Sequence, residues 1–309
     1  MAPADPPNST RAAVLVPFAL VVLIWGSTWI VIRDQLHGGA VAVPASWSVS
    51  YRFLVAGLTL AAVAAWRRER VTRDAGFWRF AALLGVTQFV MNFNFVYRAE
   101  EHITSGLVAV IFALLLIPNA LFARVFLGQR LGRQLLIGSG IAMAGVALLF
   151  VQEARSDPGG PAESLTGIAF TLCAILSAST ANVMQATRTA ARYPMIPMLA
   201  TAMLIGAGLD AGWAWITTGP PLFDPRPGYV AGVLYLGVIA SALAFTLYFR
   251  IIRAIGPAKA AYNGVIVPVI AMLLSTIFEG YRWTALAAAG AVLAAIGLVT
   301  ALKARRPAR

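Results

Sequence analysis

Residues 20–33 read LVVLIWGSTWIVIR. The stretch is rich in the apolar side chains that a helix in lipid requires, but small polar residues and two tryptophans interrupt it from Trp25 to Trp29. Such an interruption suits a helix that lines a path through the membrane, and it also suits a helix that packs closely against a neighbour. The rest of the sequence favours the first interpretation.

The chain around this stretch is too apolar for a soluble protein. Of its 309 residues, 60% are hydrophobic and only 12% are charged, which is far less polar surface than a soluble protein of this length needs. Apolar runs of about 20 residues, the length that crosses the hydrocarbon core, recur along it. We therefore predict an all-α polytopic membrane protein with ten transmembrane helices, at residues 14–32, 45–65, 77–97, 103–124, 131–151, 164–187, 195–217, 228–249, 256–278 and 283–302.

Basic residues collect on one side of this arrangement. With the N-terminus in the cytoplasm, eighteen of the 24 Lys and Arg residues fall in inner segments, but only Asp5, Glu69 and Asp74 among the acidic residues do. This is the positive-inside pattern, and flipping the chain would reverse it. The net charge of +12 therefore reflects membrane orientation, and both termini are predicted to be cytoplasmic.

The second half of the chain repeats the first at an offset of about 152 residues, which lays residues 25–28 over residues 177–180. Positions that match at or near this offset are Gly85 and Gly237, Tyr97 and Phe249, Gly145 and Gly297, and Pro118 and Pro268. Several matches at one spacing indicate an internal duplication. Each repeat, 14–151 and 164–302, holds five spans, so the second copy is inverted in the membrane and a central cavity is expected between the two. The polar tails, 1–13 and 303–309, are expected to be disordered and cytoplasmic.

Several short stretches resemble a known family. Residues 25–28 (WGST), 51–54 (YRFL), 236–244 (LGVIASALA) and 256–260 (GPAKA), followed by Pro268 and Glu279, are similar in order and spacing to EamA-type members of the drug/metabolite transporter superfamily. The resemblance covers about residues 14–302. It implies ten helices, a central cavity and export of amino acids, metabolites or drugs, and one branch of the family exports aromatic amino acids. The first half departs from the pattern at Gln129, where the family usually has Glu.

Polar and aromatic side chains from five spans are predicted to line the cavity. Gln88 and Asn92 lie four residues apart and share a helix face, and unpaired amides are too costly in lipid for this face to meet it. Hydrogen bonding between helices would explain the same residues, and close packing would explain the small residues beside Trp25. The predicted substrate-binding residues are Trp25, Thr28, Gln88, Asn92, Asn94, Ser179, Asn182, Tyr248, Tyr262 and Asn263.

Three residues are predicted to gate the path. Trp29 lies nearer the outer end of its span, and Pro118 and Pro268 lie inside spans, where proline removes a helical hydrogen bond. A static kink is the alternative for both prolines.

One deeply placed charge needs a partner. Arg52 lies well inside the second span, and we predict a structural ion pair between Arg52 and Asp210, with Glu100 and Glu101 as other candidates. Snorkelling of the guanidinium to the outer headgroups is the alternative.

Features that the sequence lacks narrow the function. It has no phosphate-binding loop, no Cys/His cluster and no hydrolase triad, so we expect no enzyme, no cofactor and no metal site. No carboxylate falls at the centre of a predicted span, which favours facilitated transport or exchange, or coupling through a carboxylate near the outer end.

The predicted function is export of small neutral or zwitterionic metabolites, above all amino acids, by alternating access across a bacterial cytoplasmic membrane. The alternatives are a drug or nucleotide-related metabolite carrier and a non-transporting scaffold or receptor. The expected partners are a small-molecule substrate and membrane lipid, and no nucleic acid is expected to bind. The protein is expected to be a monomer or a homodimer.

Overall fold

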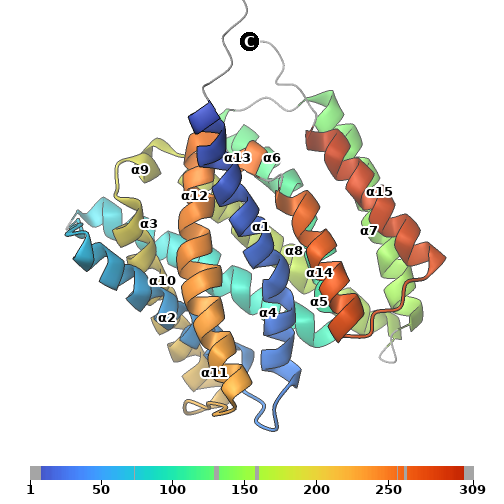
Figure 1. The fold of residues 1–309 in the computed structure, drawn as a ribbon, viewed down its shortest axis with the longest axis horizontal. Coiled ribbons are helices and arrows are strands. Elements are labelled where there is room, and N and C mark those ends of the chain that lie inside the picture. The colour runs from blue at the N-terminus through green and yellow to red at the C-terminus, as the bar shows by residue number, and fades with distance from the viewer. Residues whose placement is uncertain are drawn as a thin grey trace, which may run out of the picture.

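The computed structural model describes residues 8–72, 74–128, 132–156, 160–255, 257–260 and 263–302. Within these ranges every regular element is helical (Figure 1). The elements are α1 (Asn8–His37), α2 (Ala45–Trp66), α3 (Ala75–Leu84), η1 (Gly85–Met91), α4 (Asn92–His102), α5 (Ser105–Phe112), η2 (Ala113–Leu115), α6 (Leu116–Leu127), α7 (Arg133–Ser156), α8 (Gly160–Gln185), α9 (Arg188–Ala191), α10 (Met195–Thr218), α11 (Pro227–Leu234), η3 (Tyr235–Leu243), α12 (Ala244–Ile255), α13 (Pro257–Ala260), α14 (Asn263–Phe278) and α15 (Ala285–Leu302).

The described helices account for all ten predicted spans. Seven helical segments are long and apolar enough to cross a membrane, and three shorter apolar helices, in α7, α14 and α15, correspond to the remaining spans. The prediction of an all-α, ten-helix polytopic protein is therefore confirmed. One boundary differs, because α1 already begins at Asn8 and residues 8–13, expected to be a disordered tail, continue the helix. Residues 303–309 lie outside the described part.

The packing of the helices follows the internal repeat. Helix α1 packs against α12 and α14 of the second half, and α8, its repeat equivalent, packs against α4, α5 and α6 of the first half. The equivalent helices α2 and α10 pack on each other, as do α7 and α15 at one edge of the bundle (Figure 1). Equivalent helices thus make equivalent contacts. Two inverted halves related by a pseudo-twofold axis in the membrane plane produce this pattern.

Small residues hold α7 and α15 close together. A Cβ added at Gly145 would lie 2.6 Å from the Gly290 carbonyl oxygen, and one added at Gly297 would lie 2.6 Å from the Gly138 carbonyl oxygen. Side chains at these positions would therefore meet backbone, as in the small-xxx-small contacts of membrane helices. This seam joins the first half to the second within one chain.

Two spans contain π-helical segments at equivalent places. Segment η1 continues α3 into α4, and η3 continues α11 into α12. Gly85 and Gly237, which the repeat relates, begin or occupy these segments, and a Cβ on either would come within 3.0 Å of a facing helix. A π segment shifts the side chains that follow it around the helix, and such segments are frequent at functional sites. The spans that carry them both contribute to the cavity described next.

Candidate substrate cavity

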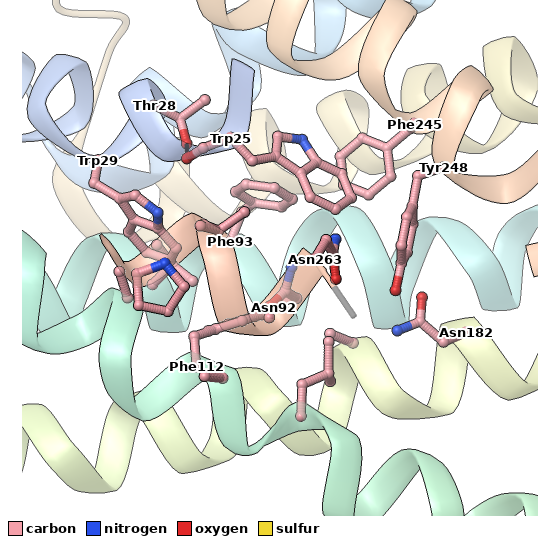
Figure 2. Close-up of a pocket in the computed structure, with 18 of the residues that line it drawn as sticks. Trp25, Thr28, Trp29, Asn92, Phe93, Phe112, Asn182, Phe245, Tyr248 and Asn263 are labelled. Carbon is pink, nitrogen blue, oxygen red and sulfur yellow. Dashed lines mark hydrogen bonds between the residues drawn. The ribbon is translucent and has the colours of Figure 1, made fainter. Parts of the chain in front are cut away.

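A cavity of about 830 Å³, its opening included, lies between the two halves. Its walls come from α1, α2, η1, α4, α5, η2 and α6 of the first half and from α8, α12 and α14 of the second. Its lining is mostly apolar with a few placed polar groups, as in small-molecule sites. Figure 2 shows side chains from several of these helices converging on the space.

The quoted stretch of α1 supplies one wall of the cavity. Trp25, Thr28 and Trp29 follow the three- and four-residue spacing of one helix face, and all three line the cavity. Gly26 lies on another face, where an added Cβ would come 2.7 Å from Ile270 Cβ of α14. Neighbouring residues of the interruption therefore line the cavity and make the close helix contact.

Aromatic rings join α1 to the second half across this wall. The Trp25 ring centroid lies 5.2 Å from that of Phe245 and 4.7 Å from that of Tyr248. The Trp25 indole Nε1 also donates to the Ala240 carbonyl oxygen at 3.1 Å, a backbone group of the π segment η3. Figure 2 shows the Trp25 and Phe245 rings side by side. These contacts make an apolar platform that is fixed to both halves.

Amide groups form the polar part of the cavity. Gln88 and Asn92 are 3% exposed, yet the Gln88 Oε1 and Asn92 Oδ1 atoms have no hydrogen-bond partner among the described residues. On the facing α8, Asn182 donates to Asn119 Oδ1 at 3.4 Å. The Tyr248 hydroxyl is also unpaired within the described part, and Figure 2 shows it directed toward Asn182. Buried polar atoms without partners are costly, so these groups are suited to bind water or a polar ligand.

The structure brings most of the predicted substrate-binding residues together. Asn94, by contrast, donates to Asp210 Oδ1 at 2.7 Å and accepts from Ser46, and it does not line the cavity. Ser179 is fully buried in α8 away from it, and Tyr262 lies outside the described residues. Those that line the cavity are Trp25, Thr28, Gln88, Asn92, Asn182, Tyr248 and Asn263.

The predicted pair of Arg52 and Asp210 is wrong. Arg52 Nε donates to Ser241 Oγ at 2.9 Å, whereas Asp210 is held by Asn94, and no described carboxylate forms an ion pair with Arg52. Snorkelling is also excluded, because Arg52 is 1% exposed and lines the cavity. The guanidinium carbon instead lies 4.3 Å from the centroid of the Phe93 ring. Sequence alone does not show which way a side chain points around its helix axis.

The three predicted gating residues occupy different positions. Trp29 is 8% exposed, lines the cavity and lies with its ring centroid 5.8 Å from that of Phe112, so it is not a lipid-belt residue. Pro268 lines the cavity from inside α14, whose helix continues through it. Pro118 is buried in the first turn of α6, three residues after the end of the 3₁₀ turn η2 that interrupts its span, and it does not line the cavity.

Three phenylalanines of the cavity were not predicted. Phe93, Phe112 and Phe245 all line it, and the ring centroids of Phe93 and Phe245 are 6.0 Å apart. Phe93 and Phe245 are related by the same 152-residue offset as the repeat, so the two equivalent rings meet near the axis. The offset could therefore have identified this pair.

A polar cluster around Glu279 lies at the end of the bundle opposite the start of α1 and the end of α15 (Figure 1). Glu279 Oε1 accepts from Ser105 Oγ at 2.6 Å and lies 3.8 Å from Arg33 Nε, and Ser275 donates to the other oxygen. Arg33 Nη1 also donates to the Glu100 carbonyl oxygen at 2.9 Å. Glu279 follows α14, whereas Arg33 and Ser105 belong to the first half. The cluster therefore ties the two halves together at this end.

We expect Glu279→Gln to loosen this contact and so to open this end of the cavity more often. Arg33 is partly exposed, so its pairing contributes about 1 kcal/mol, and removing the charge should raise the population open at this end about fivefold. The measurement is the labelling rate of a cysteine at Ile32, which lines the cavity, by a membrane-impermeant thiol reagent in a Cys173→Ser background. Glu101→Gln is the matched control, since Glu101 is an exposed carboxylate near the end of α4, at the same end of the bundle. Equal labelling of the two variants would exclude the closing role.

Comparison with known proteins agrees with this architecture. Residues 12–151 and 165–302 each match the EamA-like transporter family. The chain is 29% identical to an uncharacterized inner membrane transporter of Escherichia coli, YedA, over 94% of this chain and 92% of that protein. It is 27% identical to a probable terminal-alkyne amino-acid exporter of Streptantibioticus cattleyicolor, over 91% and 90% of the two chains. It is 26% identical to a probable amino-acid metabolite efflux pump of Salmonella typhimurium, over 94% and 96%.

A solved crystal structure shares the fold. Its TM-score is 0.68 at 21% identity, and the alignment covers 96% of this chain and 98% of the other. The family match spans nearly all of the described helices in two copies, one for each half of the bundle. The chain therefore belongs to the EamA-like transporter family and is a multi-pass membrane transporter of that type.

Proposed function

We propose that this chain is a secondary or facilitative transporter that exports small neutral or zwitterionic metabolites, with amino acids as its substrate class. The observation that carries the proposal is the cavity between the two halves, which combines an aromatic platform with unpaired amide oxygens. Such a site suits a solute with one apolar and one polar end. Two relatives are named as a probable amino-acid exporter and a probable amino-acid metabolite efflux pump, which supports the same substrate class.

The symmetry of the helix contacts supports transport by alternating access. Helix α1 packs against α12 and α14 of the second half, and its equivalent α8 packs against α4, α5 and α6 of the first half. If the two halves exchanged conformations, the cavity would open to the other side of the membrane. The two ends of the bundle are not identical. The repeat equivalent of Arg33 is the uncharged Gln185, which accepts a hydrogen bond from Arg253 at 3.2 Å. We place the termini in the cytoplasm of a bacterial inner membrane, which puts the Glu279 cluster on the outer side.

Transport in proteoliposomes tests the proposal. We expect saturable uptake of radiolabelled amino acids, and a panel of unlabelled competitors should rank amino acids above nucleosides and apolar cations. Asn92→Leu should reduce uptake roughly tenfold, the loss expected for one hydrogen bond of about 1.4 kcal/mol. Gln134→Leu, an exposed amide at the start of α7, should leave uptake unchanged.

Two results would reject this assignment. Uptake no greater than in protein-free liposomes would favour a scaffold or receptor. A nucleoside or apolar cation that competes better than every amino acid would favour the drug or nucleotide-related carrier.

A further inference from the structure

We infer that Arg52 is the anchor for a substrate carboxylate, so that transported solutes must carry an anionic group beside their apolar part. This inference rests on the proposed transport function and specifies the chemistry of the same cavity. It starts from the fact that Arg52 lines the cavity although it is 1% exposed.

The guanidinium is held in place but not neutralised. Its Nε donates to Ser241 Oγ in η3, and its carbon atom lies over the Phe93 ring, whereas Nη1 has no hydrogen-bond partner among the described residues. Glu100 attracts the guanidinium electrostatically, but neither Glu100 carboxylate oxygen has a hydrogen-bond partner in the described part of the chain. Tyr97, whose hydroxyl donates to Gln35, also adjoins the guanidinium.

A buried cation with a free donor is suited to bind an external anionic partner. Removing one partner of a buried ion pair leaves a large uncompensated cost, so an arginine kept in this state is suited to a ligand that supplies the missing charge. Guanidinium matches carboxylate geometry with two parallel donors, which an ammonium does not. The residue type and its free Nη1 therefore both favour a carboxylate.

The polar groups near Arg52 fit the other end of an amino acid. The amide oxygens of Gln88 and Asn92 are unpaired acceptors that line the same cavity. An α-ammonium group donates three hydrogen bonds, and the aromatic platform of Trp25 and Phe245 offers a surface for an apolar side chain. One free donor, two free acceptors and an aromatic wall thus complement a zwitterion with an apolar substituent.

Matched competitors test this inference on the wild-type protein. Counterflow of radiolabelled L-phenylalanine is measured against unlabelled L-phenylalanine, which has a carboxylate, and L-phenylalaninamide, which lacks it but keeps the ammonium and ring. We expect the carboxylate to compete roughly 10- to 100-fold better, the range for a hydrogen-bonded charge. Equal competition by the two compounds would overturn the inference while leaving amino-acid transport intact.

Variants then assign the preference to Arg52. Arg52→Gln should reduce the ratio of competition by L-phenylalanine to competition by L-phenylalaninamide to near one, without weakening competition by the amide. Arg52→Lys should retain part of the wild-type ratio. Arg98→Gln, a partly buried arginine outside the cavity, should retain the wild-type ratio. A wild-type ratio in Arg52→Gln would exclude Arg52 as the anchor. If Arg52→Gln does not fold, Arg52→Lys replaces it, since lysine keeps the charge but lacks the two parallel donors, and a wild-type ratio in that variant counts against the inference.

A binding measurement separates this inference from the transport proposal. The purified protein is titrated with 3-phenylpropionate and with 3-phenylpropanamide by calorimetry, which requires no transport. If no amino acid is transported but the carboxylate still binds more tightly and depends on Arg52, the proposed substrate class fails and the anchor stands. If neither compound binds differently, the anchor fails whatever is transported.

Discussion

Gly145→Val is expected to destabilise the folded transporter strongly. A Cβ at this position would meet backbone of α15, at the Gly290 carbonyl oxygen and near Ala294, so no side-chain rotation relieves the clash. The two helices would have to separate along their seam. We expect a loss of about 3 kcal/mol or more, at the upper end for overpacked contacts, and a fall of roughly 10 °C in the melting temperature.

The same helix provides the control for this substitution. Gly140 also lies in α7, but a Cβ added there has no heavy atom of the described residues within 4 Å. Valine has the same intrinsic cost in a helix at both positions, so the difference between Gly140→Val and Gly145→Val isolates the contact with α15. Thermal unfolding of the purified variants in detergent measures it. Equal melting temperatures would show that α7 and α15 do not pack as described.

Trp25→Ala is expected to reduce transport at least about tenfold. The substitution removes two ring contacts and the hydrogen bond to Ala240, each of which contributes about 1 kcal/mol. Because these contacts join α1 to α12 and η3 across the cavity, their loss removes both the apolar platform and a link between the halves. The measurement is the initial rate of amino-acid uptake into proteoliposomes at equal amounts of reconstituted protein.

Two further variants separate the role of the aromatic surface from that of the indole donor and control for loss of a tryptophan elsewhere. Trp25→Phe keeps an aromatic surface without the indole donor, so it should give an intermediate rate. Trp66→Ala removes an indole that is 82% exposed at the end of α2 and should leave the rate unchanged. A full rate in Trp25→Ala would mean that this wall of the cavity is not part of the solute path.

The sequence predicted the architecture well because its signals are local or periodic. Apolar length identified ten spans, and the offset between 25–28 and 177–180 identified a duplication whose odd span number requires inversion. The same offset did not draw attention to Phe93 and Phe245, although it relates them. Polar residues inside spans were also good candidates, since seven of the predicted binding residues line one cavity.

The errors concern residues whose role depends on how helices are rotated about their axes. Asn94 lies two residues from Asn92, yet it faces Asp210 and Ser46 instead of the cavity. On α8, Asn182 likewise lines the cavity, whereas Ser179 is buried and does not line it. The π segment η1 precedes Asn92 and rotates the residues that follow it around the helix axis, and regular helical periodicity does not predict this shift.

The sequence by itself determined the number of membrane passes, the inverted repeat and the types of side chain available for a site. These follow from hydrophobic length, from chain-internal similarity and from the cost of polar groups in lipid, all of which can be evaluated one segment at a time. Only the tertiary structure decided that Arg52 meets Ser241 and the cavity instead of Asp210, and that Glu279 meets Arg33. The physical reason is that a buried charge is satisfied by whichever groups the packed helices bring within a few ångströms, and that depends on every helix at once.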